Sequence, residues 1–451
     1  MSKQKIQLSD HFDYSRLLRF VLPCIGTMLF TSIYGIVDGL CVSNFVGKTA
    51  FAAVNLIMPV PMLVGSVGFM LGTGGSAIVG ITLGEGDREK ADRYFSLFVW
   101  TGLVAGLLLA VVGFFAVRPA ASLLGAKGEM LDYAVRYGRL LMACLPFFIL
   151  QNMFQSFFVT AENPHLGFAF TVAAGVTNMV LDVVLVGMLH GGVEGAAIAT
   201  FISQTVGGVL PVFYFLNKRS SSSIHLGRAQ WNGGVIRSAC INGSSELMTN
   251  LSMSLVNILY NYQLLRFAGE NGVAAYGVIM YAAFLFVAVF VGYAVGSAPI
   301  VSYHYGARNH AELNNLYSKS LRLIGVIAVV MTALSMLVIP YVARIFVGYD
   351  AELLALTSHA FRVYALNFFL MGFNVYGSSF FTALGDGVTS ALISFLRTLL
   401  FQLLALIFLP MVLGIEGVWL AVTAAEAGAL CVTVLMFITK DKVFHYRKVS
   451  C

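Results

Sequence analysis

The sequence predicts an all-α membrane protein of twelve transmembrane helices, arranged as two six-helix bundles that are related by a parallel internal repeat. Two observations support this fold class. Of the 451 residues, 59% are hydrophobic and only 11% are charged, which is less than half the charged share of about 25% in a soluble domain. The chain also divides into apolar stretches of bilayer length, and their pattern recurs in the second half.

Twelve stretches of the chain are candidate spans. Eleven of them have at least 18 residues without Asp, Glu, Lys or Arg, and the last is interrupted only by Glu426. A helix needs roughly 20 residues to cross about 30 Å of hydrocarbon, whereas transmembrane strands alternate over only about 10 residues. In order, the spans lie within residues 20–37, 49–84, 94–117, 140–161, 163–181, 195–217, 247–265, 271–307, 323–343, 363–385, 398–415 and 417–439.

An internal repeat divides these spans into halves. A shift of 222 residues without a gap superposes identical residues in three distant blocks, which are 47–58 on 269–280, 156–161 on 378–383 and 192–199 on 414–421. Gly192 and Glu194, for example, fall on Gly414 and Glu416. Because each half has an even number of spans, both halves take the same orientation in the membrane. Parallel repeats of this kind occur in secondary transporters.

Basic residues predict the orientation of the chain. If both termini are cytoplasmic, 18 Lys and Arg residues lie on the cytoplasmic side, eight lie on the opposite side, and Arg397 lies within a span. This bias is the one that the positive-inside rule describes. We therefore expect a multi-pass protein of the cell membrane with both termini in the cytoplasm. We also expect a monomer. Its parts are an N-terminal segment (1–16), an N lobe (17–216), a cytoplasmic linker (217–234), a C lobe (235–438) and a cytoplasmic tail (439–451).

Five charged side chains fall inside the predicted spans: Asp38, Asp182, Glu246, Arg397 and Glu426. A charge at the bilayer centre costs roughly 2.5–3.5 kcal/mol even on the lenient insertion scale, so each of them is a candidate for function. The alternative interpretation is that an acid caps a helix end or bonds to neighbouring backbone.

The first-half acids have polar companions. Asn178 lies four residues before Asp182 and therefore shares its helix face. Together with Asp38 and Thr200, these residues offer oxygen atoms suited to a proton relay or to a small cation. The repeat places no charged residue at any of the four matching positions. The ion site is therefore expected in the N lobe.

The second-half charges, Glu246, Arg397 and Glu426, likewise have no charged counterpart in the first half. An unpaired guanidinium deep in a membrane is unfavourable, so the sequence predicts that Arg397 pairs with one of the two glutamates. The alternative is a neutral glutamate bonded to backbone.

Two short motifs resemble a known family. Residues 34–38 (YGIVD) and 178–182 (NMVLD), the latter followed by Gly195 and Thr200, resemble helices of the MATE (multidrug and toxic compound extrusion) transporters, and the second half looks closer to the bacterial branches typified by MepA and DinF. The resemblance covers essentially the whole chain. It implies a secondary antiporter that exports amphipathic or cationic drugs or toxins in exchange for protons or sodium. It also makes Pro23 the bending point of the first helix, because proline lacks a backbone donor.

The same resemblance implies where the ion and the substrate bind. It assigns the coupling proton, or a sodium ion in its place, to Asp38, Asn178, Asp182 and Thr200. Of the two ions we expect the proton, a preference that is not part of the resemblance. It assigns the substrate cavity to residues of the first and fourth helices, which are Tyr34, Tyr137, Gln151, Asn152 and Gln155. The alternative for the cavity residues is simple packing between helices. No further cofactor, nucleotide or nucleic acid is expected.

Other classes of function remain as alternatives. A flippase for lipid-linked saccharides has the same architecture, but its pyrophosphate would call for several inward-facing bases, and only Arg397 lies deep in a span. A channel fits less well, because the intramembrane acids occupy different positions in the two halves, whereas a symmetric pore would repeat them. A membrane enzyme is disfavoured, since the eight histidines form no HExxH motif and residues 72–75 (GTGG) lack the Lys-Ser/Thr of a nucleotide loop.

Overall fold

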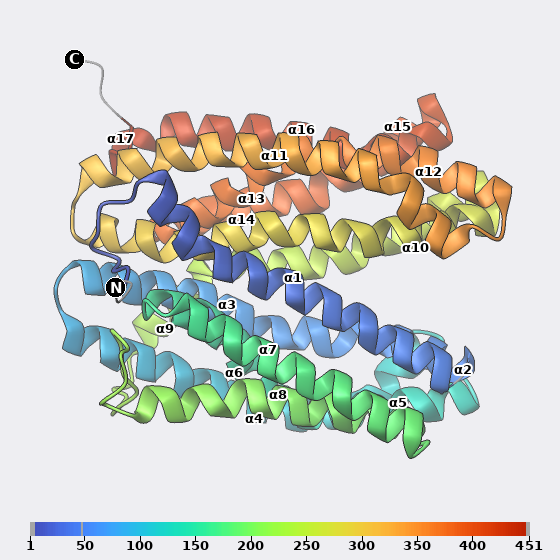
Figure 1. Cartoon of the computed structure of the whole chain (residues 1–451), viewed down its shortest axis with the longest axis horizontal. Coiled ribbons are helices and arrows are strands. Elements are labelled where there is room, and N and C mark those ends of the chain that lie inside the picture. The colour runs from blue at the N-terminus through green and yellow to red at the C-terminus, as the bar shows by residue number, and fades with distance from the viewer. Residues whose placement is uncertain (1–4, 47, 448–451) are drawn as a thin grey trace.

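The computed structural model describes residues 5–46 and 48–447, and this part of the chain is built from helices (Figure 1). The first half comprises α1 (Tyr14–Phe45), α2 (Lys48–Ile57), α3 (Pro59–Gly84), α4 (Arg88–Leu123), α5 (Glu129–Ala143), α6 (Leu145–Thr160), α7 (Pro164–Leu181), η1 (Asp182–Met188) and α8 (Gly192–Leu216). The second half comprises α9 (Gly233–Asn242), α10 (Ser244–Gly306), α11 (His310–Val347), α12 (Ala351–Ala365), α13 (Phe368–Ala383), α14 (Gly387–Phe395), η2 (Leu396–Leu400), α15 (Phe401–Leu413), α16 (Ile415–Thr439) and α17 (Asp441–Phe444).

The helices of the described residues run along the long axis of the molecule (Figure 1) and form twelve spans, as the sequence predicts. Among the described residues, nine helices are long and apolar enough to span a membrane, and two bent pairs raise the number to eleven. The twelfth span comes from α10, because its 63 residues would extend about 95 Å as one straight helix. Both ends of α10 instead adjoin α3: Gly243 lies against Met70, and Gly306 against Ile81. The chain reverses at Gly269, where φ is 60° and ψ is −148°.

The backbone repeats with the same 222-residue shift as the sequence. The fourth span bends by 56° between α5 and α6, and the tenth bends by 46° between α12 and α13. The fifth and eleventh spans each contain a π-helical turn, η1 and η2, although these two turns do not superpose under the shift. Gly192 and Gly414, which match under the shift, both have a φ of 58°, a left-handed conformation that glycine adopts without strain. Two lobes with the same internal design therefore make up the molecule.

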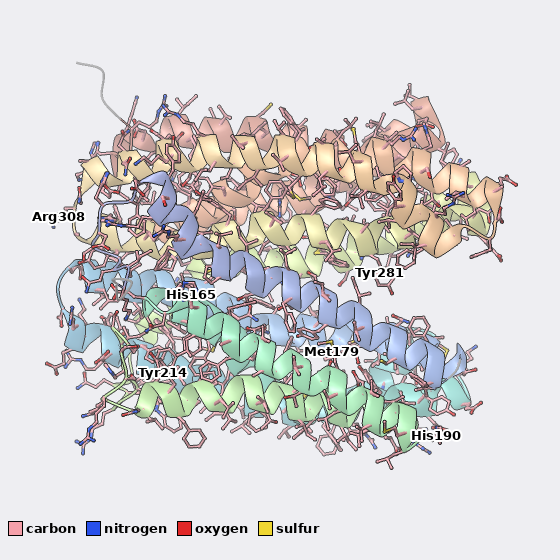
Figure 2. All side chains as sticks on the ribbon, viewed as in Figure 1. His165, Met179, His190, Tyr214, Tyr281 and Arg308 are labelled. Carbon is pink, nitrogen blue, oxygen red and sulfur yellow. The ribbon has the colours of Figure 1, made fainter. Side chains whose placement is uncertain are left out.

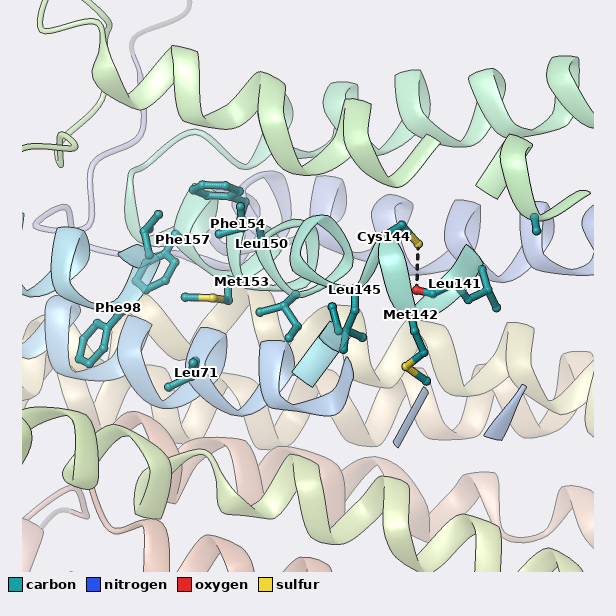
Figure 3. Packing of buried hydrophobic residues seen from close by; sticks show 14 of the residues in the cluster. Leu71, Phe98, Leu141, Met142, Cys144, Leu145, Leu150, Met153, Phe154 and Phe157 are labelled. Atoms are coloured by element: carbon teal, nitrogen blue, oxygen red, sulfur yellow. Dashed lines mark hydrogen bonds between the residues drawn. The ribbon is translucent and has the colours of Figure 1, made fainter. Parts of the chain in front are cut away.

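The bend between α5 and α6 lies in the densely packed core of the N lobe (Figure 3). Cys144 interrupts the helix there, and its thiol donates to the backbone oxygen of Leu141 at 3.2 Å and to Oε1 of Gln204 at 2.8 Å. Met142, Leu145 and other apolar side chains surround it. The bend is thus held by buried contacts on both sides.

The lobes meet at the end of the molecule where both termini lie, called here the termini end (Figure 1). Arg308 lies at this end and His190 at the opposite end (Figure 2). Glycines allow the backbones to touch there: a Cβ on Gly84 would overlap the backbone oxygen of Tyr303, and a Cβ on Gly306 would overlap that of Ile81. Further along, Gly292 lets α10 approach α1 at Ile25. The termini end of the interface is therefore closed.

The N-terminal segment before α1 contacts both lobes at this closed end. The backbone N–H of Leu8 donates to Glu162 of the N lobe at 2.8 Å, and that of Phe12 donates to Glu312 of the C lobe at 2.9 Å. The His11 ring lies 2.7 Å from the second oxygen of Glu312. Leu8 and Phe12 are themselves buried, at 1% and 0% exposure. The segment thus strengthens the contact between the lobes.

Asp386, in the loop between α13 and α14, gives the termini end a dependence on pH. Burial alone would raise the pKa of this carboxyl, but bonds from Lys440 Nζ at 2.7 Å and from Thr389 outweigh it and lower the pKa below its usual value. The stabilisation is therefore complete above the unfolded pKa of about 3.9 and is lost as pH falls through the lower folded value.

We accordingly expect Asp386→Asn to lower the free energy of unfolding by about 1–2 kcal/mol near neutral pH, because the charge that pairs with Lys440 is removed. Below about pH 4 the deficit relative to the wild type should shrink, since protonation removes the same charge there. Thermal unfolding in detergent at several pH values measures both quantities. A deficit that stays constant down to acid pH would show that the charge of Asp386 has no part in it.

Candidate functional site

The N-lobe acids are brought together by the packing of α1 on α7. Gly175 of α7 has no side chain, and a Cβ there would lie 2.5 Å from the Phe30 ring and 3.0 Å from the Tyr34 ring. Both rings belong to α1 and therefore rest directly on the α7 backbone. Asp38 follows Tyr34 by one helical turn, and Asp182 begins η1 directly after α7.

The carboxyl groups of Asp38 and Asp182 are neighbours. Each lies close enough to the other to affect its ionisation. Asp182 is wholly buried, at 0% exposure. Among the described residues, no donor bonds to either of its carboxyl oxygens or to Oδ1 of Asp38. Two carboxylates at this separation repel, and one proton shared between them converts the repulsion into a hydrogen bond.

Asp182 also marks a change of helix type. From this residue to Met188 the chain is π-helical, and π-helical turns are frequent at functional sites because they rotate side chains out of the regular helical register. The Asp182 backbone N–H still bonds to the backbone oxygen of Asn178. The Asn178 side chain, at 2% exposure, is therefore buried one turn from the acid pair.

Two further polar groups approach the pair from other helices. Tyr137 of α5 is wholly buried, and its hydroxyl lies beside Thr200 of α8 and within range of the charges of both aspartates. The structure thus gathers all four residues predicted for the coupling ion, together with two of those predicted for the substrate, Tyr34 and Tyr137. No cluster of three or more His, Cys, Asp or Glu suited to a metal occurs among the described residues.

The other predicted substrate residues lie on α6, deeper in the N lobe. Gln151 and Asn152 are 7% and 4% exposed, and Oε1 of Gln151 and Nδ2 of Asn152 have no hydrogen-bond partner in the described part of the chain. Gln151 packs against Gly207 of α8. Gln155 is half-buried on the same helix. Gln151 and Asn152 are therefore buried within the lobe, on a helix that carries neither acid of the pair.

Pro23 lies inside α1, which continues through it as one helix from Tyr14 to Phe45. The backbone oxygen of Pro23 accepts a bond from the Thr27 hydroxyl at 2.9 Å. The neighbouring Cys24 and Ile25 lie against Gly292 of α10. In this conformation the weak point of α1 is thus held by the C lobe.

The C lobe contains the predicted ion pair. Nη1 of Arg397, on η2, lies 3.7 Å from Oε1 of Glu426, on α16. The other carboxylate oxygen of Glu426 accepts from Asn374 at 2.7 Å, and Asn374 accepts from the Thr433 hydroxyl at 2.8 Å. The pairing expected from the unfavourable burial of an isolated guanidinium is confirmed.

A cavity of about 290 Å³ lies between the lobes, mostly within the C lobe. Glu246, Arg397 and Glu426 line it, as do Thr73 of α3 and Ser156 of α6. None of the five residues predicted for the substrate borders this cavity. Its wall is instead formed largely by residues that the sequence analysis did not select.

Among these unselected residues are polar and aromatic side chains of the C lobe, including Asn257, Tyr260, Tyr276, Tyr364 and Gln402. Gln402 is the single amide of its predicted span, residues 398–415, and that isolation was a usable signal. Asn257 is one of four amides within residues 247–265 and does not stand out in the same way. The tyrosines gave no such signal, since aromatic residues are common throughout the chain.

Comparison with known proteins agrees with this architecture. The model of the MatE family matches residues 23–184 and 247–407, one segment in each lobe. The multidrug export protein MepA of Staphylococcus saprophyticus is 22% identical over 434 residues, which cover 95% of each chain.

Solved structures are similar over almost the whole chain. A crystal structure of MATE in complex with MaL6 has a TM-score of 0.92 at 25% identity and covers 98% of this chain and 100% of its own. A crystal structure of MATE in the straight conformation has a TM-score of 0.91 at 25% identity, with 99% and 100% covered. These relatives are transporters, not enzymes.

Proposed function

Because the chain belongs to the MATE family of transporters, we propose that it exports amphipathic or cationic small molecules across the cell membrane in exchange for protons, by alternating access to the cavity between its lobes. The antiport proposal rests on the environment of Asp182. This wholly buried carboxylate is a neighbour of Asp38, and no hydrogen-bond donor among the described residues reaches its oxygens. The MepA relatives are multidrug export proteins.

In this proposal the acid pair couples the ion to the movement. A shared proton lets Asp38 bond to Asp182, whereas loss of the proton restores repulsion between α1 and η1. That change biases the position of α1, whose weak point at Pro23 packs on α10 of the other lobe. Polar groups lie around the pair and can bond to it with or without the shared proton; they belong to Asn178, Thr200 and Tyr137. Tyr34, next to the pair, and the amides of α6 do not border the cavity in this conformation. They would contact substrate only at a separate position within the N lobe.

Sodium is the alternative coupling ion, since Asp38, Asn178, Asp182 and Thr200 offer it the same oxygen atoms. The orientation follows from the basic residues: the closed termini end faces the cytoplasm. A saccharide flippase is less well supported, because a pyrophosphate in the cavity would meet two carboxylates and one guanidinium that is already paired.

The proposal predicts gradient-driven transport in proteoliposomes that contain the purified protein. An inward proton gradient should drive the export of ethidium from inside-loaded vesicles, because proton entry and substrate exit share one conformational cycle. The measurement is dye efflux under a pH gradient, compared with a sodium gradient at equal pH and with protein-free vesicles. Efflux that follows sodium at clamped pH would replace the proton by sodium, and efflux that ignores both gradients would contradict antiport.

A further inference from the structure

The C-lobe charge group has an odd number of charges, and the structure shows how two of them are fixed. Glu426 is 1% exposed and is held by Arg397 on one oxygen and by Asn374 on the other. Asn374 also donates to the Glu426 backbone oxygen at 2.9 Å. Glu426 is therefore anchored as the counter-ion of Arg397, and the pair contributes no net charge.

Glu246 remains as the third charge. It lies on α10, within range of the Arg397 charge but outside the distance of an ion pair. All three charged residues border the same cavity. With each group ionised, the cavity wall carries one negative charge in excess.

The same cavity has unused bonding capacity and aromatic walls. Nε of Arg397 and the hydroxyl of Tyr260, which is 1% exposed, have no hydrogen-bond partner within the described residues. The rings of Tyr260 and Tyr276 are stacked, with centroids 4.8 Å apart. Aromatic rings attract organic cations through their faces. The cavity thus offers aromatic surface, together with polar groups that are free to bond, to a molecule bound there.

We propose that Arg397 determines the charge of the substrate: by neutralising Glu426 it leaves the cavity one negative charge, so that organic cations with a single positive charge bind better than those with two. This inference rests on the proposed function, since it names the substrates of the exporter. Charge balance decides affinity here because an unneutralised charge in a site of low dielectric is strongly unfavourable. A dication would leave one positive charge unneutralised.

Ethidium and propidium are matched probes, because they share a phenanthridinium ring and propidium adds a second quaternary ammonium on its side arm. Their binding to the purified protein is measured by fluorescence anisotropy without any ion gradient. The quantity of interest is the ratio of the two dissociation constants, and changes in this ratio between variants cancel the difference in size.

Arg397→Gln leaves two acids unneutralised, so that the second positive charge of propidium can pair with Glu426. The ratio should therefore shift toward propidium by about tenfold or more, since an added charge pair of about 1.4 kcal/mol gives a factor of ten. Arg397→Gln/Glu426→Gln restores one excess charge and should return the ratio to that of the wild type. Glu416→Gln changes an exposed acid of the same helix, α16, and should leave the ratio unchanged.

If Arg397→Gln does not fold, Gln402→Glu adds an acid to the same cavity wall and should shift the ratio in the same direction. An unchanged ratio in a folded Arg397→Gln or Gln402→Glu protein would overturn the inference and would indicate that Arg397 only joins helices. Because binding is measured without a gradient, this failure is distinct from a failure of ion-coupled efflux.

Discussion

Asp182→Asn is expected to abolish ion-coupled efflux while the protein still folds and inserts, and Asp38→Asn is expected to do nearly the same. The amide is close in size to the carboxyl, so packing around the wholly buried Asp182 is preserved. It cannot take up or release the proton that the pair shares. Dye efflux under an imposed proton gradient should therefore fall to the level of protein-free vesicles.

Asp132→Asn provides the matched control, because Asp132 is an exposed acid at the start of α5 in the same lobe. It should transport at the rate of the wild type. Ethidium binding without a gradient should persist in both pair variants, which separates loss of coupling from loss of fold. Gradient-driven efflux at the full rate in either pair variant would remove that aspartate from the coupling mechanism.

Gly306→Ala should have an equally large effect on transport for a different reason. The added methyl group would overlap the backbone oxygen of Ile81, where α10 contacts α3 at the closed termini end. Backbone cannot move aside as a flexible side chain can, so the conformation described here should be strongly disfavoured. We expect transport to be nearly lost, with increased hydrogen exchange in residues 81–87 and 303–309.

The control for this substitution is Gly277→Ala, on the same helix, where a Cβ would have nothing within 4 Å. It should leave both transport and exchange unchanged. Normal transport by Gly306→Ala would mean that the close approach of α3 and α10 is not a step of the cycle.

The sequence predicted much of this architecture, because membrane spans and repeats leave local signals. Span length follows from bilayer thickness, and the 222-residue shift relates backbone features as specific as the positive φ of Gly192 and Gly414. The pairing of Arg397 with Glu426 followed from the cost of an isolated buried charge. Each of these features could be predicted because it depends on a few residues that can be identified in the sequence alone.

The remaining features depend on contacts between distant segments. The bend at Cys144 uses Gln204, 60 residues away, and the N-terminal segment reaches Glu312, about 300 residues away. The cavity wall draws on tyrosines from several C-lobe helices, whereas the substrate residues predicted from the sequence lie on α1, α5 and α6 of the N lobe. No local sequence pattern predicts such long-range contacts, since any apolar helix can pack against several others.

The release of protons on substrate binding tests the coupling role of Asp38 and Asp182 most directly. Tetraphenylphosphonium is a cation without a titratable group, so any proton released when it is added to the detergent-purified protein in weakly buffered solution comes from the protein. The wild type is expected to release about one proton per molecule bound, because the pair shares one, and the Asp38→Asn/Asp182→Asn protein is expected to release none. Equal release from the two proteins, whether one proton or none, would contradict proton coupling by this pair.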